Sequence, residues 1–473
     1  MKKNGVLKII LFVVLGIFAL FGIFFLIIML LPEDEGPGED RAETVETEEY
    51  EADEESEEKE PGKDGSEKEN KQGKKTDERP TVTVGTDAKS ATVMVYMNGS
   101  DLESMGGEAS IDISEMLKSG VGETVNVIIQ TMGTKKWNDY DISSRTAQTY
   151  RAVDGSLELL RDDLGKLDCT KAETLSEFID YCKTEYPADR YIMLFWDHGG
   201  GPVYGFGKNE WGDSEESLTV DEMIKAFKEN EDVHFDIIGM DCCIMGSLET
   251  VYSFEPFCKY ALLSEDFESQ IGWDYTGWMK KLEEDPGIST PLLGKYIVDE
   301  VVESNEESEY GDSVSIGLYN ETSVKNLFSA WKEYAYKNEE DLLGTNFSHL
   351  HTSRGKQKKD FFDQWTQDES DVTLSDYYIS DILAIVENID NESDEAKALT
   401  SALKATVAYF GHSGEKNELT GLAISLPYGD PYFYEELKKV YSRLGLDKDY
   451  IEWLESFVDA ENTGDFYDYS DFE

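Results

Sequence analysis

Residues 191–201 read YIMLFWDHGGG, and residues 235–245 read FDIIGMDCCIM. Each stretch starts with a largely apolar run and ends in glycines or in side chains that can react. Runs of successive apolar residues are typical of parallel strands that helices cover on both faces. The two stretches therefore predict a pair of buried β-strands, each followed by a chemically active turn.

Apolar runs of the same kind lie on both sides of these two stretches. They cover residues 92–97, 125–130, 148–153 and 260–263. Amphipathic stretches separate the runs, as an alternating β/α fold requires. In the connection between the two quoted stretches, Thr219 and Glu222 fit a capping box, so we expect a helix to begin at Val220. The pattern predicts an α/β fold with a parallel, doubly wound sheet.

The chain changes character toward its carboxyl end. A strand at 313–319, a helix around 324–336 and a late strand at 421–426 predict an α+β C-terminal part packed on the preceding core. We place the core at residues 91–312, the C-terminal part at 313–458 and an acidic, frayed tail at 459–473.

The amino end predicts a membrane anchor. Residues 9–31 are 23 consecutive residues without a polar or charged side chain, and about 20 suffice to span the hydrocarbon as a helix. Lys2, Lys3 and Lys8 precede this span, so residues 1–8 should form a cytoplasmic stub and the rest should be extracellular. A cleaved signal peptide is the alternative interpretation, although its core is usually only about 7–15 residues long.

Between the span and the core lies a strongly acidic stretch, residues 32–90. It is rich in Glu, Asp, Lys, Gly and Ser up to Pro80, and it has too little apolar surface to offset the entropy of ordering. We therefore expect a disordered tether between the membrane and the folded core.

The composition of the chain excludes several classes of partner and of structural site. The chain of 473 residues has a formal net charge of -57, from 100 Asp and Glu against 43 Lys and Arg. Such a charge repels phosphate backbones, so we expect no nucleic-acid partner. Its 5 Cys are an odd number and show no zinc-finger spacing, which disfavours a disulfide framework and a structural zinc site.

The two quoted turns predict the reactive groups. If their strands are neighbours, His198 and Cys243 emerge side by side on one edge of the sheet, as a base and a nucleophile. We also expect a helix to begin close to Cys243, which would lower the pKa of its thiol. The backbone N–H groups of Gly199 and Cys243 could then bind the oxyanion of a tetrahedral intermediate. These parts predict acyl transfer.

At this point the sequence resembles a known family. Asp197-His198-Gly199 after an aromatic-rich strand, followed by Asp241-Cys242-Cys243-Ile244-Met245, resembles the His and Cys motifs of the clostripain family of cysteine peptidases. Segments 93–97, 186–191, 272–275 and 420–428 are also similar to family segments. The resemblance covers about residues 91–458. It implies a caspase-like α/β sandwich and an endopeptidase that cleaves after Arg or Lys.

Carried over by position, the resemblance makes Cys243 the nucleophile and His198 the general base. It places Asp241 in the primary specificity pocket, where the carboxylate would meet the Arg or Lys side chain of the substrate. A second interpretation makes Asp241 a third catalytic residue that orients His198. The family usually has Ala where this chain has Cys242, so a vicinal disulfide that disables the nucleophile is a further alternative.

Family members are often activated by self-cleavage between the His and Cys strands. The corresponding loop, 202–217, contains one basic residue, Lys208, which we predict as the processing site. No cofactor is predicted. Some members require calcium, but no Asp-x-Asp-x-Asp-Gly loop occurs here, and the sequence leaves that question open.

Two other functions are compatible with an anchored chain of this kind. A sortase-like transpeptidase would also combine an anchor with Cys and His, but the Thr-Leu-x-Thr run that precedes the sortase cysteine is absent. A catalytically silent surface-binding protein on a peptidase scaffold is the other alternative. The intact set of His198, Cys243 and Asp241 favours the membrane-anchored peptidase.

Overall fold

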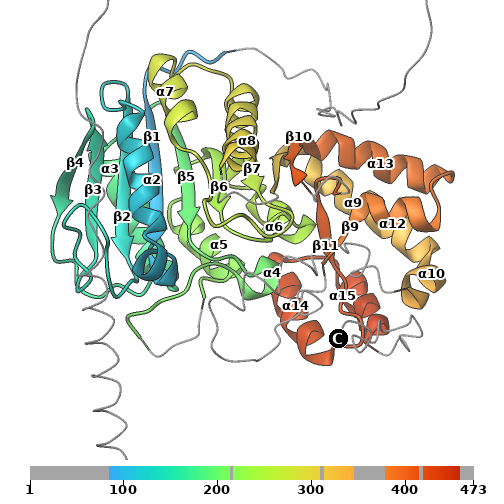
Figure 1. The fold of residues 1–473 in the computed structure, drawn as a ribbon. Helices are drawn as coiled ribbons and strands as arrows, with labels where there is room; N and C mark the ends of the chain where they lie inside the picture. The colour runs from blue at the N-terminus through green and yellow to red at the C-terminus, as the bar shows by residue number, and fades with distance from the viewer. Residues whose placement is uncertain (1–84, 213–216, 309–313, 346–378, 415–418, 459–473) are drawn as a thin grey trace, which may run out of the picture. The chain divides into compact units, whose positions relative to one another are not determined.

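The computed structural model describes residues 85–212, 217–308, 314–345, 379–414 and 419–458. These residues form a nine-stranded sheet in the order β10-β8-β7-β6-β5-β1-β2-β3-β4, with helices on both faces (Figure 1). The strands are β1 (Ala91–Asn98), β2 (Val125–Met132), β3 (Gln148–Val153), β4 (Ser156–Arg161), β5 (Arg190–Trp196), β6 (Phe235–Asp241), β7 (Cys258–Leu263), β8 (Ser315–Asn320) and β10 (Val407–His412).

The sheet is mixed and mostly parallel at its centre. Strands β2, β1, β5, β6 and β7 are mutually parallel, whereas β3, β4, β8 and β10 pair antiparallel with their neighbours. All six strands that the sequence predicts before residue 300 are present. The predicted central, mostly parallel sheet is confirmed, and β3 is one of the antiparallel exceptions: the segment between β2 and β3 contains no helix, and a parallel return requires a crossover that is usually helical.

The core has two layers, one on each face of the sheet. Along β1, Val93 and Val95 face one buried cluster while Met94 and Tyr96 face the other, as the two-residue period of a strand requires. On the Val93 side the packed helices are α2 (Glu108–Lys118), α7 (Thr276–Glu284) and α8 (Thr290–Glu307). On the Met94 side they include α3 (Ala172–Glu185), α5 (Val220–Glu229), α6 (Leu248–Phe254) and α9 (Val324–Lys337).

Helix α5 begins at Val220, as the sequence predicts, but not through the expected capping box. Thr219 occupies the N-cap position without making a side-chain cap hydrogen bond. Glu222 instead accepts a hydrogen bond from the backbone N–H of Ala172, at 3.2 Å, and so connects α5 to the start of α3. The apolar stripe of Val220, Met223 and Phe227 remains, and it is the burial of that stripe that fixes the helix on the sheet.

The C-terminal part continues the same sheet. Strands β8 and β10 extend it at the edge beyond β7, so the sheet runs through the boundary that the sequence places at residue 312. A separate two-stranded sheet pairs β9 (Ile379–Asp381) with β11 (Ala423–Ser425). The remaining helices are α4 (Gly201–Tyr204), α10 (Glu339–Gly344), α12 (Ile382–Ile389), α13 (Asp394–Thr406), α14 (Pro431–Leu444) and α15 (Lys448–Leu454).

The predicted stub, span and acidic tail (residues 1–8, 9–31 and 459–473) lie outside the described residues, as does the tether up to residue 84. Among the helices that are described, none has both the length and the apolar character to cross a bilayer.

Candidate active site

The pairing of β5 with β6 brings the two motifs together. These strands are parallel neighbours with Trp196 opposite Asp241, so the turns that follow them leave the sheet at the same edge. A methyl group added to Gly199 would lie 2.0 Å from the carbonyl oxygen of Cys243 and 3.0 Å from the sulfur of Cys242. Only glycine fits there, because the backbone after His198 lies directly against the backbone of Cys243.

The turn after β6 has an unusual backbone. Ile244 has a φ of 53°, a left-handed conformation that is rare for a β-branched residue and costs energy. The N–H of Ile244 donates to the carbonyl of Asp266 at 2.9 Å, and that of Gly246 donates to Ser264 at 2.6 Å. The turn is therefore held by the segment after β7, and Cys243 is presented at the point where the chain reverses.

The backbone of this turn corrects the expectation that a helix begins close to Cys243. Helix α6 begins at Leu248, with Ser247 as its N-cap, and not close to Cys243. Ile244 has a left-handed φ of 53°, and Ser247 has an extended backbone with φ -117° and ψ 155°, so a right-handed helix cannot run through residues 244–247. A helix amino terminus thus does not lie at the thiol. The backbone N–H of Glu268 does, at 3.4 Å from the sulfur of Cys243, and a donor in that position favours a sulfur anion.

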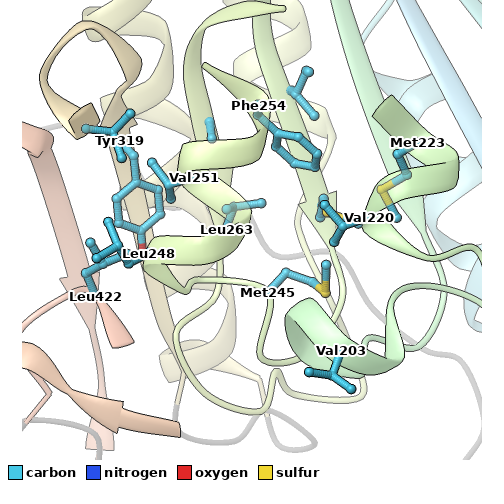
Figure 2. Close-up of a cluster of buried hydrophobic side chains, with 14 of the residues drawn as sticks. Val203, Val220, Met223, Met245, Leu248, Val251, Phe254, Leu263, Tyr319 and Leu422 are labelled. Carbon is cyan, nitrogen blue, oxygen red and sulfur yellow. The ribbon is translucent and has the colours of Figure 1, made fainter. Parts of the chain in front are cut away.

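Both motif turns are anchored in one apolar cluster. Figure 2 shows Met245 and Leu248, from the segment after Cys243, together with Val203 from α4, which follows the glycines after His198. Met223 of α5 is part of the same cluster. Because interiors are densely packed, this anchoring restricts movement of one turn relative to the other.

The two adjacent cysteines have different surroundings. Cys242 is buried, with 3% of its surface exposed, and belongs to the apolar core, whereas Cys243 is partly accessible. Burial, followed by the charge of Glu268, raises the pKa of Cys242 well above its ordinary value. Both are free thiols in the structure, without a vicinal disulfide. Cys243 is the one placed to react.

The imidazole of His198 is hydrogen-bonded to a residue that the sequence analysis did not single out. Its Nε2 lies 3.1 Å from Oδ1 of Asp101, which follows β1. The pKa of His198 is raised: burial lowers it, but the hydrogen bond with Asp101 and the charges of Asp197 and Asp101 outweigh that effect. The carboxylate at His198 is thus Asp101. The hydrogen bonds of Asp241 are made elsewhere.

Asp241 ends β6 in a buried position, with 5% of its surface exposed. Its Oδ2 accepts hydrogen bonds from the hydroxyl of Tyr275 at 2.7 Å and from the backbone N–H of Trp273 at 3.4 Å. Burial raises the pKa of Asp241 to about 6, against the hydrogen bonds that lower it. The carboxyl is therefore held firmly but at an energetic cost when ionised.

Further acidic groups surround Asp241. Burial, followed by the charge of Asp241, raises the pKa of Glu268 and of Asp112 well above their ordinary values. Burial also raises the pKa of Glu115 to about 7. The side chains of Asp241 and Glu268 also share a hydrogen bond, which lowers the pKa of Asp241 and raises that of Glu268. In the part of the chain that the structure describes, no Lys or Arg forms an ion pair with Asp241 or Glu268.

Lys208 lies next to His198 and away from Asp241. Its Nζ is 3.4 Å from Oδ2 of Asp101. Its backbone N–H donates to Asp197 at 2.7 Å, and its carbonyl accepts from the side chain of Asn98 at 2.7 Å. The peptide bond after Lys208 is therefore held by residues other than the predicted oxyanion donors.

Two site residues, Asp101 and Glu268, were missed by the sequence analysis, although a signal for them exists. Asp101 follows the carboxyl end of β1 and Glu268 follows that of β7, and these strands flank β5 and β6 in the sheet. Ligands bind beyond the carboxyl ends of strands in open α/β sheets, so the rule that identified His198 and Cys243 applies to both. Among the described residues, no group of three or more His, Cys, Asp or Glu side chains is arranged to hold a metal ion.

The fold and this arrangement of residues define an α/β protein of the kind found in C11 proteases. A structure of an inactive zymogen C11 protease from Parabacteroides distasonis has a TM-score of 0.56 at 18% identity and covers 75% of this chain and 97% of that one. A secreted C11 cysteine protease from Bacteroides thetaiotaomicron, in complex with an irreversible peptide inhibitor, has a TM-score of 0.57 at 16% identity, covering 76% and 99%. At such identities the likeness concerns the fold.

The sequence comparison identifies the family. The model of the clostripain family, peptidase C11, matches residues 95–468, most of the chain. The chain therefore belongs to the clostripain family of cysteine peptidases. It is also similar to clostripain from Hathewaya histolytica, with 27% identity over 312 residues. That match covers 54% of this chain and 57% of clostripain, so the chain spans little more than half of that relative.

Proposed function

We propose that this chain is a cysteine endopeptidase that cleaves after Arg or Lys, with Cys243 as nucleophile and His198 as general base. The observation that carries the specificity is the buried pair of Asp241 and Glu268, which has no basic partner in the described structure. Buried carboxylates are costly unless a cation pairs with them. The side chain of a substrate Arg or Lys supplies that cation, and its guanidinium or ammonium can donate to both carboxylates.

The geometry supports a two-step acyl transfer. His198 takes the proton of the Cys243 thiol, and the sulfur attacks the carbonyl carbon of the scissile bond. The backbone N–H groups of Gly199 and Cys243, whose chain segments lie against each other, stabilise the oxyanion. The imidazolium then donates the proton to the leaving amine. In the second step His198 takes a proton from water, the water oxygen attacks the thioester carbon, and the sulfur of Cys243 leaves and regains its proton from His198.

We propose further that residues 9–31 anchor the enzyme in the cell membrane as a single span. Lys2, Lys3 and Lys8 support a cytoplasmic amino end, which puts residues 91–458 outside the cell. Fractionation of cells that express the full chain, with protease added from outside, tests this topology: an uncleaved chain in intact cells contradicts it.

Self-processing at Lys208 is also part of the proposal. In the described structure its carbonyl is bonded to Asn98, so cleavage requires the 202–217 loop to leave this arrangement first. Purified wild-type chain should slowly be cut within this loop into two fragments, and Cys243→Ala should remain intact. A Lys208→Met chain cut at the same rate as wild type would contradict the assignment of the site.

The direct test of function is hydrolysis of a panel of fluorogenic peptides that differ only in the residue before the reporter. Arg and Lys peptides should be cleaved, and Gln, Leu and Asp peptides should not. The matched control is Cys243→Ala, assayed at the same concentration. No hydrolysis of any peptide by the wild-type chain, before or after processing, would instead favour a silent surface-binding protein.

A further inference from the structure

The contact between His198 and Asp101 links two turns that follow adjacent parallel strands, β5 and β1. A carboxylate only accepts hydrogen bonds, so the hydrogen between the two groups belongs to Nε2 of the imidazole. The other ring nitrogen, Nδ1, is then left unprotonated in the neutral ring. This contact therefore decides which nitrogen can take a proton.

We propose that Asp101 is the positioning residue of the active site: it holds the ring of His198 through Nε2, so that Nδ1 receives the proton of the Cys243 thiol. The inference rests on the proposed function, because it takes His198 as the general base. It assigns to Asp101 the orienting role that the sequence left open for Asp241.

The backbone that carries Asp101 is fixed to an unusual degree. Ser100 is fully buried and has a φ of 43°, in the left-handed region that few residues other than glycine adopt. Its hydroxyl donates to Oδ1 of Asp197 at 2.6 Å. Since Asp197 precedes His198, the two turns are joined by a second hydrogen bond. Backbone strain that the surroundings maintain is common at functional sites.

A rare helical turn follows directly and is equally constrained. Residues Leu102–Gly106 form a single π-helical turn, a geometry that occurs mostly at functional sites. Within it, Glu103 is fully buried and accepts hydrogen bonds from the N–H of Ser110 at 2.9 Å and from the N–H of Asn138 at 2.6 Å. Asp101 is thus presented by a segment that is braced on both sides.

The charges around His198 act in opposite directions. Asp101 and Asp197 favour the imidazolium, and Lys208 opposes it. Asp101 itself stays ionised: burial alone raises its pKa, but the hydrogen bond and charge of His198, together with Lys208, hold the pKa below the ordinary value. Removing Asp101 should therefore lower the pKa of His198, while removing Lys208 should raise it.

A purely structural account would make Asp101 a partner of Lys208 alone. The distances favour His198, at 3.1 Å from Oδ1 against 3.4 Å for Lys208 from Oδ2. The Lys208 side chain is also 61% exposed, and ion pairs in such positions contribute little. The two accounts predict different pH profiles, which makes them separable.

The experiment compares Asp101→Asn and Lys208→Met in the full-length chain, with kcat and KM for an Arg peptide measured from pH 5 to 10. Asp101→Asn should lower kcat by about 10²-fold with KM within about twofold, because general-base catalysis is lost while binding is kept. The acidic limb of kcat/KM, which reports the pKa of the base that must be unprotonated, should move down by about one pH unit. In Lys208→Met the limb should move up. Asp221→Asn removes a similarly exposed aspartate, ion-paired to Arg443 at 2.7 Å, and serves as the matched control.

Four outcomes would overturn the proposal. If the limb moves the same way in Asp101→Asn and Lys208→Met, or does not move in Asp101→Asn, the positioning role is overturned. An equal loss of kcat in Asp221→Asn, or a lowered melting temperature in Asp101→Asn that accounts for its loss, also overturns it. In each case an active wild type with an inactive Cys243→Ala leaves the proposed function standing. An inactive wild type would instead contradict the function itself.

Discussion

The two ends of strands β5 and β6 differ in whether their buried charged side chains have a partner of opposite charge. At their amino ends, the buried Arg190 and Asp236 form an ion pair, with Nε 2.5 Å from Oδ2. Arg190 also donates to the carbonyls of Pro286 at 2.9 Å and Ile288 at 2.6 Å. At the carboxyl ends of the strands, Asp241 at the end of β6 is buried and Glu268 after β7 is half-buried, and among the described residues no Lys or Arg pairs with either.

The difference separates stability from function within the same two strands. A buried charge that is paired with an opposite charge is tolerated, whereas a buried carboxylate without a cation destabilises the fold. Ile244 and Ser100, which lie at the carboxyl edge, have positive φ values, as does Asp154 in the turn after β3. Strain and unpaired charge together mark the edge where a ligand is expected.

The largest effect should come from the two adjacent thiols. Cys243→Ala should abolish hydrolysis of Arg peptides and labelling by an arginyl chloromethylketone, because it removes the accessible one of the two thiols. Cys242→Ala should keep both, since its side chain lies in the core and its high pKa keeps it protonated. Mass spectrometry of the labelled chain checks the assignment. Label on Cys242, or activity that survives Cys243→Ala, would refute it.

The next effect concerns the paired end. Arg190→Met should lower the free energy of unfolding by about 3 to 5 kcal/mol, because it removes the buried partner of Asp236. Lys259→Met is the matched control: Lys259 also pairs with Asp236, but its side chain is 53% exposed, so its loss should cost about 1 kcal/mol or less. Urea titration followed by tryptophan fluorescence measures both. Equal losses would mean that burial does not distinguish the two pairs.

The smallest effect, of opposite sign, is expected at the unpaired end. Because the pKa of Asp241 is raised to about 6, the folded chain binds its proton more tightly than the unfolded chain does, and stability falls as the pH rises from about 4 to 6. Above that range the penalty is complete. Asp241→Asn should thus be more stable than wild type by about 1 to 3 kcal/mol at pH 7.5, and the gain should shrink toward pH 4. A destabilised variant at pH 7.5 would contradict the unpaired state of this carboxyl.

Much of the fold could be predicted because its strands are apolar on both faces. Strands β1, β5 and β6 are largely apolar runs, and the sequence located each within about one residue. Strand β4 escaped because it lies near the edge and is largely accessible, so its residues lack such a run. The antiparallel direction of β3 was not predicted, because the direction of a strand depends on the connection that precedes it and not on its own residues.

The site was predicted only as far as single motifs carry information. His198 and Cys243 stand out because each follows an apolar run. The pairing of β5 with β6 could be inferred from the two consecutive runs. Asp101 is almost a hundred positions from His198 and has no motif of its own, so only the strand order makes it a neighbour. The helix expected at Cys243 was wrong because the backbone of Ile244 is left-handed and that of Ser247 is extended, and neither conformation belongs to a right-handed helix.

The most direct test of the central claim compares peptides that end in arginine with peptides that end in citrulline, which has nearly the same shape without the charge. If Asp241 and Glu268 bind the cationic side chain of the substrate, the wild-type chain should prefer arginine by at least about 10²-fold in kcat/KM. Removing one charge of a buried pair costs about 3 kcal/mol. Asp241→Asn should lose most of that preference while still cleaving citrulline peptides at the wild-type rate. A preference that is unchanged in Asp241→Asn would contradict the account.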